Sequence, residues 1–231
     1  MPLQQLDNIV WHSLTGPQAS LSTGTALARR YAAGLPQLLA FADLARPDFA
    51  AIEPYCEPGE HFYLGGWSGR VPSGWQIDAE AMLLMMVWPG PAPDATAAAA
   101  EASDCLRLGP AHVAQMLELV ALTKPGPFGP RTLELGEYFG CFEGPRLVAM
   151  AGERMFAGRL REISGVCTHP DFQGRGLARR LMEKLLRLEL QRGELPFLHV
   201  MKANAGAHHL YRRMGFREHR ELVVRVLSRP P

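Results

Sequence analysis

The chain has 231 residues, of which 47% are hydrophobic, and its formal net charge is +1. This length provides for one large domain or two smaller ones, each with a proper hydrophobic core. The low hydrophobicity and high net charge typical of disordered chains are both missing, and the near-neutral total excludes nucleic-acid binding by bulk charge.

The charge is distributed unevenly along the chain. Residues 1–104 carry four arginines and no lysine against eleven acidic residues, which gives −7. Residues 105–231 carry twenty basic residues against twelve acidic ones, which gives +8. Such asymmetry predicts an anionic ligand in the second half.

The cysteines stand singly, and the eight histidines form no spaced set with them or with one another. These spacings predict neither a disulfide framework nor a zinc site, so no metal is expected. The first residues lack the features of a signal peptide, and the most apolar run, residues 81–88, is far short of the roughly 20 residues that span a bilayer. We therefore expect a cytoplasmic protein with no membrane partner. The cysteines are Cys56, Cys105, Cys141 and Cys167.

The first part of the chain gives mixed signals. Residues 26–31 and 35–41 carry helix-forming side chains, and residues 47–52 fit a short helix. Residues 61–64 and 75–87 instead contain strand-like or buried apolar runs. These elements predict an α/β unit without fixing its topology.

A proline-rich segment ends this part. Residues 88–94, Trp-Pro-Gly-Pro-Ala-Pro-Asp, cannot continue a regular element, and an alanine-rich stretch follows them. The change of charge falls at the same place. We therefore predict an N-terminal half over residues 1–88, a linker over 89–104 and a second domain over 105–231.

The second domain has a cleaner pattern. Glycine-containing pairs at 143–144 and 157–158 separate three strand-like stretches, as expected for antiparallel hairpins. A strongly amphipathic helix follows, with apolar residues at the 3.6 period. The predicted elements are helices over 110–122, 174–192 and 205–214 and strands over 137–142, 146–156, 160–168, 197–201 and 221–227. The fold class is α+β, with a mixed, mostly antiparallel twisted sheet flanked by helices.

The turn before the long helix carries the clearest chemical signal. A strand ends near Thr168, and two glycines, Gly174 and Gly176, open the helix. Helix N-termini bind phosphate through unpaired N–H groups, and glycines allow close approach. Arg175, Arg179 and Arg180 add positive charge. The alternative is an ordinary strand-to-helix turn, and the Walker and dinucleotide patterns do not fit.

Here the sequence resembles the GNAT superfamily of N-acetyltransferases. The run Gln173–Ala178 fits the family's Gln/Arg-x-x-Gly-x-Gly/Ala signature, which cradles the pyrophosphate of acetyl-CoA, and Asn204 with Tyr211–Phe216 fits its Asn…Tyr-x-x-x-Gly-Phe element. The match covers about residues 105–227. It looks closest to the glycine N-acyltransferase-like branch, in which a degenerate half of the same fold can precede the active one, so residues 1–88 are expected to be such a half.

The resemblance implies direct acyl transfer from acetyl-CoA to an amine. It assigns the pantetheine and the thioester carbonyl to the backbone of Val166, Cys167 and Thr168. The Cys167 thiol itself is not expected to be a nucleophile, because it sits in a strand among apolar neighbours with no motif that would lower its pKa. Asn204 would contact the pantetheine, act as a helix N-cap, or do both. The pyrophosphate would be held by Gln173, Gly174, Arg175, Gly176, Leu177, Ala178 and Arg179.

Two residues are candidate catalysts. Tyr211 matches the family tyrosine that protonates the departing thiolate, the alternative being a tyrosine packed on the sheet. Glu162 lies eleven positions before Gln173, on the strand leading into that turn, where the histone acetyltransferase branch of the family places its glutamate base, so the resemblance makes it the candidate general base. Its alternative is a surface pair with Arg161 or Arg159, and many family members use water chains instead. His199 is a weaker base candidate and a histidine of the core is the alternative.

The leading interpretation is an acetyl-CoA-dependent N-acetyltransferase for a small or amino-acid-like amine. The alternatives are acetylation of a protein N-terminus or lysine, and a non-catalytic acetyl-CoA sensor. The loop at residues 124–130 falls where family members build the acceptor pocket. No nucleic-acid partner is expected, and edge pairing through the last strand would offer a route to a homodimer.

Overall fold

The computed structural model describes residues 2–91 and 105–230 and contains two sheets. The smaller sheet has three strands: β1 (Ser22–Gly24), β2 (Ala28–Tyr31) and β3 (Leu39–Phe41). The larger has eight: β4 (His61–Gly65), β5 (Gln76–Val87), β6 (Leu106–Arg107), β7 (Tyr138–Glu143), β8 (Arg146–Ala157), β9 (Leu160–Thr168), β10 (Leu195–Met201) and β11 (Arg217–Ser228). The helices are α1 (Ile9–Thr15), α2 (Phe49–Ile52), α4 (Val113–Thr123), α5 (Leu177–Gln191) and α6 (Ala205–Met214).

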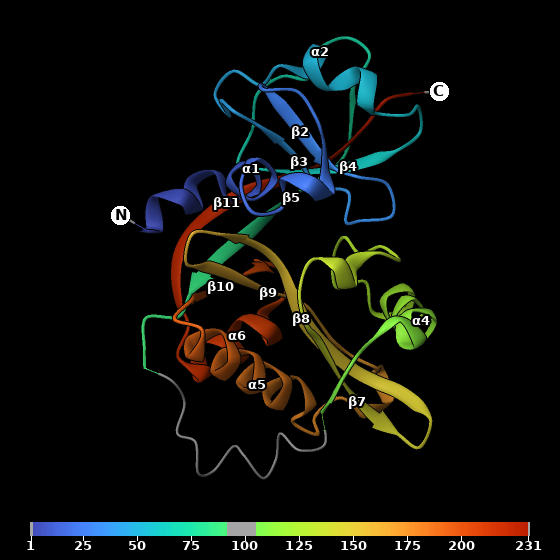
Figure 1. The fold of residues 1–231 in the computed structure, drawn as a ribbon, viewed down its shortest axis with the longest axis vertical. Coiled ribbons are helices and arrows are strands. Elements are labelled where there is room, and N and C mark those ends of the chain that lie inside the picture. The colour runs from blue at the N-terminus through green and yellow to red at the C-terminus, as the bar shows by residue number, and fades with distance from the viewer. Residues whose placement is uncertain (1, 92–104, 231) are drawn as a thin grey trace.

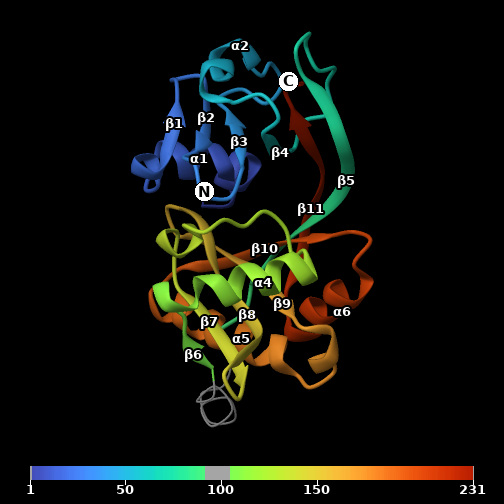
Figure 2. The ribbon, with the colours of Figure 1, turned by 90° about the vertical axis from the view of Figure 1, so that its right-hand side faces the viewer.

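The large sheet has the order β4-β11-β5-β10-β9-β8-β7-β6, and the described strands pair antiparallel except β9 with β10. Its lower part in Figures 1 and 2 is covered on one face by α5 and α6 and on the other by α4, and α1 contacts β8 nearer the unit of β1–β3. The buried side of α5 contains Leu181, Met182 and Leu185, which pack on Ala149 and Leu198 of the sheet. The fold class predicted from the sequence is confirmed.

A long antiparallel ribbon, β5 with β11, joins the two parts of the molecule. Both strands have twelve residues and run side by side from the α5–α6 layer to the unit that contains β1–β3 (Figure 2). Apolar side chains of β5, such as Met85 and Met86, lie in the cores on opposite faces of the sheet. The apolar run at residues 75–87 is therefore a strand, β5, whose C-terminal residues Leu84–Met86 are buried on both faces of the sheet.

The two helix-like segments of the N-terminal part were predicted wrongly. Residues 28–31 and 39–41 are strands β2 and β3, which pair antiparallel with one another. Most of their side chains are buried, and those of Tyr31 and Phe41 are fully so. Helix propensity is a weak preference, and burial on both faces of a small sheet outweighs it here. The other predicted elements are confirmed, with ends displaced by a few residues.

The structure differs from two expectations about how the chain is organised. The predicted boundary at residue 88 does not separate two sheets, because β4 and β5 belong to the sheet of β7–β11. Most of the predicted linker, residues 92–104, lies outside the described residues. The last strand, β11, lies between β4 and β5, so it offers no free edge for a homodimer. In the described part of the chain, no helix is both long and apolar enough to cross a membrane.

Candidate active site

The two parallel strands of the large sheet separate part-way along their length. In the described chain, β9 and β10 pair only where Leu160–Glu162 lie opposite Leu195–Phe197. Beyond this point β9 stays bonded to β8 and β10 to β5. A cavity of about 550 Å³ opens there, lined by residues 163–168 of β9 and 199–201 of β10. The unpaired edge of β9 thus leaves backbone polar groups available to a bound molecule.

The turn between β9 and α5 is open above its glycines. Gly174 and Gly176 have φ of 76° and 77°, a left-handed conformation that favours glycine, and a Cβ at either would meet no atom within 4 Å. Gly176 is the N-cap of α5 and no side chain caps that helix. The first N–H groups of α5 therefore lie unpaired at the positive end of its dipole. This turn fits the pyrophosphate of acetyl-CoA in space and in charge.

The side chains around the turn play different parts. Arg175 is exposed, and its guanidinium carbon lies 4.6 Å from the ring centroid of Phe172. Arg179 pairs with Glu183 at 2.7 Å. Leu177 is buried in the core and Ala178 is half-buried, so these two would reach a phosphate only through their backbone. Gln173 lines the cavity.

The N-terminus of α6 borders the same cavity. Oδ1 of Asn204 accepts a hydrogen bond from the Ala207 N–H at 3.1 Å, which confirms the N-cap interpretation. Asn204 and Ala207 also line the cavity. The position expected to contact the pantetheine therefore faces the space that a ligand would occupy.

Tyr211 lies one helical turn beyond Ala207 and also lines the cavity. It is 6% exposed. Burial, with a contribution from Cys167, raises the pKa of Tyr211, so its hydroxyl carries its proton at neutral pH and can donate it. Burial also raises the pKa of the Cys167 thiol to about 11. A protonated thiol agrees with the prediction that Cys167 is no nucleophile.

Glu162 is fully buried and bound at both oxygens. Oε2 accepts from Nε of Arg154 at 2.8 Å, and Oε1 accepts from Nη2 of Arg154 at 2.7 Å. Burial would raise the pKa of Glu162, but the charge and hydrogen bonds of Arg154, with His199, outweigh it and lower the pKa to about 2. The described lining of the cavity does not include Glu162. A carboxylate in this state is a weak base without direct access to a substrate.

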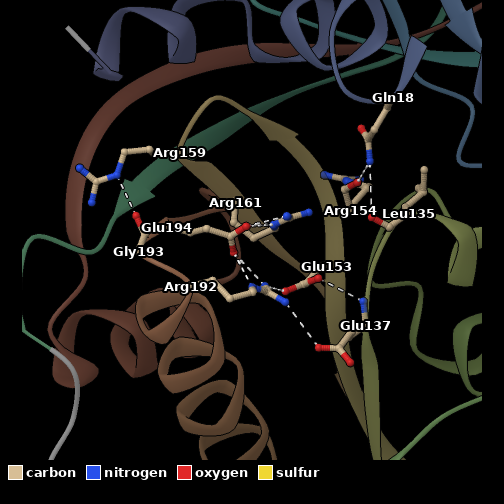
Figure 3. Close-up of polar contacts among 10 residues, drawn as sticks. All are labelled: Gln18, Leu135, Glu137, Glu153, Arg154, Arg159, Arg161, Arg192, Gly193 and Glu194. Atoms are coloured by element: carbon tan, nitrogen blue, oxygen red, sulfur yellow. Dashed lines mark hydrogen bonds and ion pairs between the residues drawn. The ribbon is translucent and has the colours of Figure 1, made fainter. Parts of the chain in front are cut away.

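The partner of Glu162 is not one of the arginines considered from the sequence. Arg159 donates to the Gly193 carbonyl and Arg161 donates to Glu194, and both side chains point toward the end of α5 (Figure 3). Arg154 lies apart from them, and its carbonyl accepts from Nε2 of Gln18 at 2.7 Å. The N-terminal segment thus holds the strand that carries the arginine. A charge inside the apolar run of β8 was the sequence signal for this pair.

His199 completes the chain of contacts. Nδ1 of His199 lies 2.7 Å from Oε1 of Glu162, and His199 lines the cavity while Glu162 does not. A carboxylate acceptor fixes the proton on Nδ1, which leaves Nε2 as a hydrogen-bond acceptor. The arrangement Arg154–Glu162–His199 can therefore hold an imidazole in the tautomer that accepts a proton from a ligand in the cavity.

The N-terminal part forms much of the rest of the cavity wall. The loop 123–127 lines one side, as expected from the sequence, but residues 6–10 and strands β4, β5 and β11 also contribute. No motif marks these positions, because a wall needs only small or apolar side chains. Among the described residues, no group of three or more His, Cys, Asp or Glu is placed to hold a metal ion.

The acetyltransferase (GNAT) family model matches residues 116–216. A crystal structure of a proposed acetyltransferase of the GNAT family from Novosphingobium aromaticivorans is 34% identical, with a TM-score of 0.89, over 98% of this chain and 99% of that one. A GCN5-related N-acetyltransferase from Kribbella flavida, 17% identical over 96% of this chain and 95% of its own, shares the fold with a TM-score of 0.61.

A GCN5-related N-acetyltransferase-like protein from Streptococcus suis shares the fold as well, with 15% identity, a TM-score of 0.61, and 98% of this chain and 96% of that one covered. None of the curated proteins matches the chain. The likeness to the Novosphingobium protein extends over the whole of both chains, including the N-terminal part. This chain is therefore an acyltransferase enzyme and belongs to the GNAT family of acetyltransferases.

Proposed function

We propose that the protein is an acetyl-CoA-dependent N-acetyltransferase that acts on the primary amine of a small molecule. The observation that supports it most is the joint position of His199 and Tyr211 on one cavity, beside the unpaired edge of β9. A base, an acid and backbone donors are the groups that transfer of an acyl group to an amine requires. The volume of about 550 Å³ is in the range of small-molecule sites.

Acetyl-CoA would supply the activated acyl group as a thioester. The N–H groups of Gly176 and the first turn of α5 would hold its pyrophosphate, with Arg175 beside them. Residues Val166–Thr168 would hold the pantetheine arm with their free backbone groups. Asn204 would add a contact from the start of α6.

His199 would accept the proton of the attacking amine at Nε2, while Glu162 and Arg154 keep the imidazole in place. The C–N bond forms as the C–S bond breaks. Tyr211 would donate its proton to the departing sulfur. Backbone N–H groups of β9 would stabilise the negative charge on the carbonyl oxygen, a contribution that is often the largest in acyl transfer. In this scheme Glu162 is a positioning residue rather than the base itself.

The likeness to the glycine N-acyltransferase-like branch stays a prediction, as does the amino-acid-like acceptor that it suggested. A protein acceptor is less well supported, because residues 6–10 and the loop 123–127 both contribute to the cavity wall. A sensor without turnover would have no use for the Glu162–His199 pair.

The test is release of CoA thiol from acetyl-CoA by the purified protein across a panel of amines, with the acetylated product identified by mass. CoA should also raise the unfolding temperature, since a ligand at about 100 times its dissociation constant adds roughly 2.7 kcal/mol to stability. If CoA leaves that temperature unchanged, the proposal fails at its first step. Binding of acetyl-CoA without turnover of any amine would favour a sensor.

A further inference from the structure

We infer that the acceptor is a primary amine on an uncharged, apolar body, held in a groove along the β5–β11 ribbon. This inference rests on the proposed function and specifies its second substrate. The groove is defined here as the part of the cavity lined by β5, β11, β4 and residues 6–10. It begins beside His199 and continues into the N-terminal part of the molecule.

One face of the ribbon forms the floor of the groove. On β5, every second residue from Ala79 to Met85 lines the cavity, and the charged Glu80 lines it as well. Their register partners on β11 include Leu222, Val224 and Val226, which also line it. Side chains at alternate positions share a face, so the floor is continuous, and the six residue steps from Ala79 to Met85 extend over about 20 Å.

The groove starts at the candidate base. His199 is the register partner of Met85, and paired residues of antiparallel strands lie on the same face. An amine nitrogen at Nε2 of His199 therefore has Met85 and Leu83 as its next neighbours along the floor. The body of the acceptor would have to follow the ribbon away from the CoA site.

The rest of the groove lining is also largely apolar. It is formed by side chains from the first helical segment, the loops around β3, and strands β4 and β8: Leu6, Ile9, Val10, Leu38, Leu44, Tyr63 and Met155. An apolar lining binds apolar surface and gives little to a polar one.

The charged side chains of the groove are already neutralised. Arg154 is paired with Glu162, and Arg220 donates to Asp7 and to the Leu6 carbonyl. Glu80 accepts from Arg225. In the described chain, Lys124 is the one charged lining residue with no ion pair, and it lies on the exposed loop across from the ribbon. Among the described residues, the ribbon therefore offers no unpaired charge that could bind a charged group on the acceptor.

This balance disfavours amino acids and diamines. The carboxylate of an amino acid lies two bonds from the amine nitrogen, so it would be buried next to His199 and Glu162. Arg154, a cation of the cavity lining, already gives its Nε and Nη2 donors to Glu162, whose carboxylate balances its charge. A buried carboxylate without a partner is costly, and so is a second ammonium among apolar side chains.

The first experiment uses pairs of acceptors that differ in one group. We expect kcat/KM for 2-phenylethylamine to exceed that for phenylalanine by at least about 100-fold, and butylamine to exceed 1,4-diaminobutane likewise. From butylamine to octylamine, kcat/KM should rise about fourfold per methylene. Binding of 2-phenylethylamine to the complex with CoA is measured by calorimetry in parallel, so that an inactive protein still gives a result.

The second experiment alters the groove. Ala81→Trp should fill it and raise KM for 2-phenylethylamine about tenfold or more, with KM for acetyl-CoA unchanged. Met82→Trp is the matched control, because Met82 is the next residue of β5, is exposed and does not line the cavity. Val224→Thr, which keeps the size of the side chain and adds a hydroxyl, should raise the same KM severalfold even if the tryptophan variant does not fold.

The outcomes separate the two proposals. If the wild-type protein does not bind CoA, the proposed function is overturned. CoA binding with equal or better turnover of phenylalanine or 1,4-diaminobutane would overturn the acceptor inference alone. CoA binding with neither turnover nor calorimetric binding of 2-phenylethylamine would do the same. Apolar amine binding that Ala81→Trp weakens and Met82→Trp does not would support the inference, with or without turnover.

Discussion

Nδ1 of His199 lies 2.7 Å from Oε1 of Glu162, whose oxygens also accept from Arg154, so one carboxylate joins an imidazole at the cavity to a buried guanidinium. Among the described residues, Nε2 of this imidazole has no hydrogen-bond partner, and His199 lines the cavity. The geometry therefore favours His199 as the base, with Glu162 behind it. The sequence suggested the reverse, with Glu162 as the candidate base and His199 as the weaker one.

His199→Ala should lower kcat by about 100-fold or more at neutral pH, because a positioned base contributes roughly 10²–10⁴-fold. Initial rates of thiol release at saturating acetyl-CoA measure this loss. The dissociation constant of CoA should stay the same, since the pyrophosphate turn lies on another element. A variant with normal kcat would show that water removes the proton without this histidine.

Tyr211→Phe should lower kcat by about 100-fold with little change in stability, because phenylalanine keeps the packing and loses only the hydroxyl. Thiol release compared between acetyl-CoA and an acetyl thioester with a more acidic thiol tests the role. A stable thiolate needs no proton when it leaves, so the better leaving group should recover most of the rate. An equal loss with both donors would count against general acid catalysis by Tyr211.

Glu162→Gln should destabilise the protein by about 3–5 kcal/mol at pH 7, because it leaves Arg154 buried without its counter-ion. Since the folded pKa of Glu162, about 2, is below the ordinary 4.5, its contribution is complete above pH 4.5 and is lost as the pH falls toward 2. The difference between wild type and variant in urea unfolding should shrink over that interval.

Glu134→Gln is the matched control for that change. Glu134 accepts from Nε and Nη2 of Arg131 at 2.7 Å each, the same two-point geometry on the surface. An exposed pair contributes little, so its loss should hardly alter unfolding at pH 7. Equal effects of the two substitutions would show that burial does not set the strength of the Glu162 pair.

Glu189→Gln should stabilise the protein, and more so at pH 8 than at pH 5. Glu189 is fully buried in α5, and neither carboxylate oxygen has a hydrogen-bond partner among the described residues. Burial, with the nearby Glu153 and Glu194, raises its pKa well above 4.5. Above pH 4.5 the unfolded chain ionises first, so wild-type stability falls by up to about 1.4 kcal/mol per pH unit until the folded pKa is reached.

Thermal unfolding between pH 5 and pH 8 measures this difference. Glu183→Gln is the control on the same helix, because Glu183 is paired with Arg179 and should give no comparable gain. A wild type whose stability relative to Glu189→Gln is the same at both pH values would contradict the prediction.

Arg175→Glu should weaken CoA binding by about tenfold or more, because it places a negative charge beside the N-terminus of α5. Calorimetry with CoA measures the change. Arg70→Glu gives the same change of charge at an exposed site in the N-terminal part and should leave the affinity unaltered. Equal affinity in the two variants would remove Arg175 from the phosphate site.

Sequence reasoning succeeded where one short segment dictates the structure. The glycine turn at Gly174–Gly176, the amphipathic period of α5 and the Asn204 cap each depend on neighbours within a few residues, so their chemistry is visible in the sequence. The strand before the turn was placed at its observed ends, Leu160–Thr168.

It failed where distant segments meet. Glu162 and Arg154 come from adjacent strands, but their partner His199 arrives from β10, 37 positions further on, and no local pattern announces the contact. The groove is made of ordinary alanines, leucines and valines from both ends of the chain. Helix propensity in residues 26–41 was likewise overruled by pairing between strands that no single window contains.

The β5–β11 ribbon has a consequence for how such an enzyme can change. The strand pair that carries the floor of the proposed groove also pairs with the strand of His199, so the proposed acceptor site and the candidate base belong to one continuous hydrogen-bonded sheet. A fragment that began at residue 89 would lack β5, the strand that lies between β10 and β11. If the ribbon holds the acceptor, acceptor preference cannot be changed by replacing the N-terminal part as a separate domain. It can change only through single substitutions of side chains along β5 and β11.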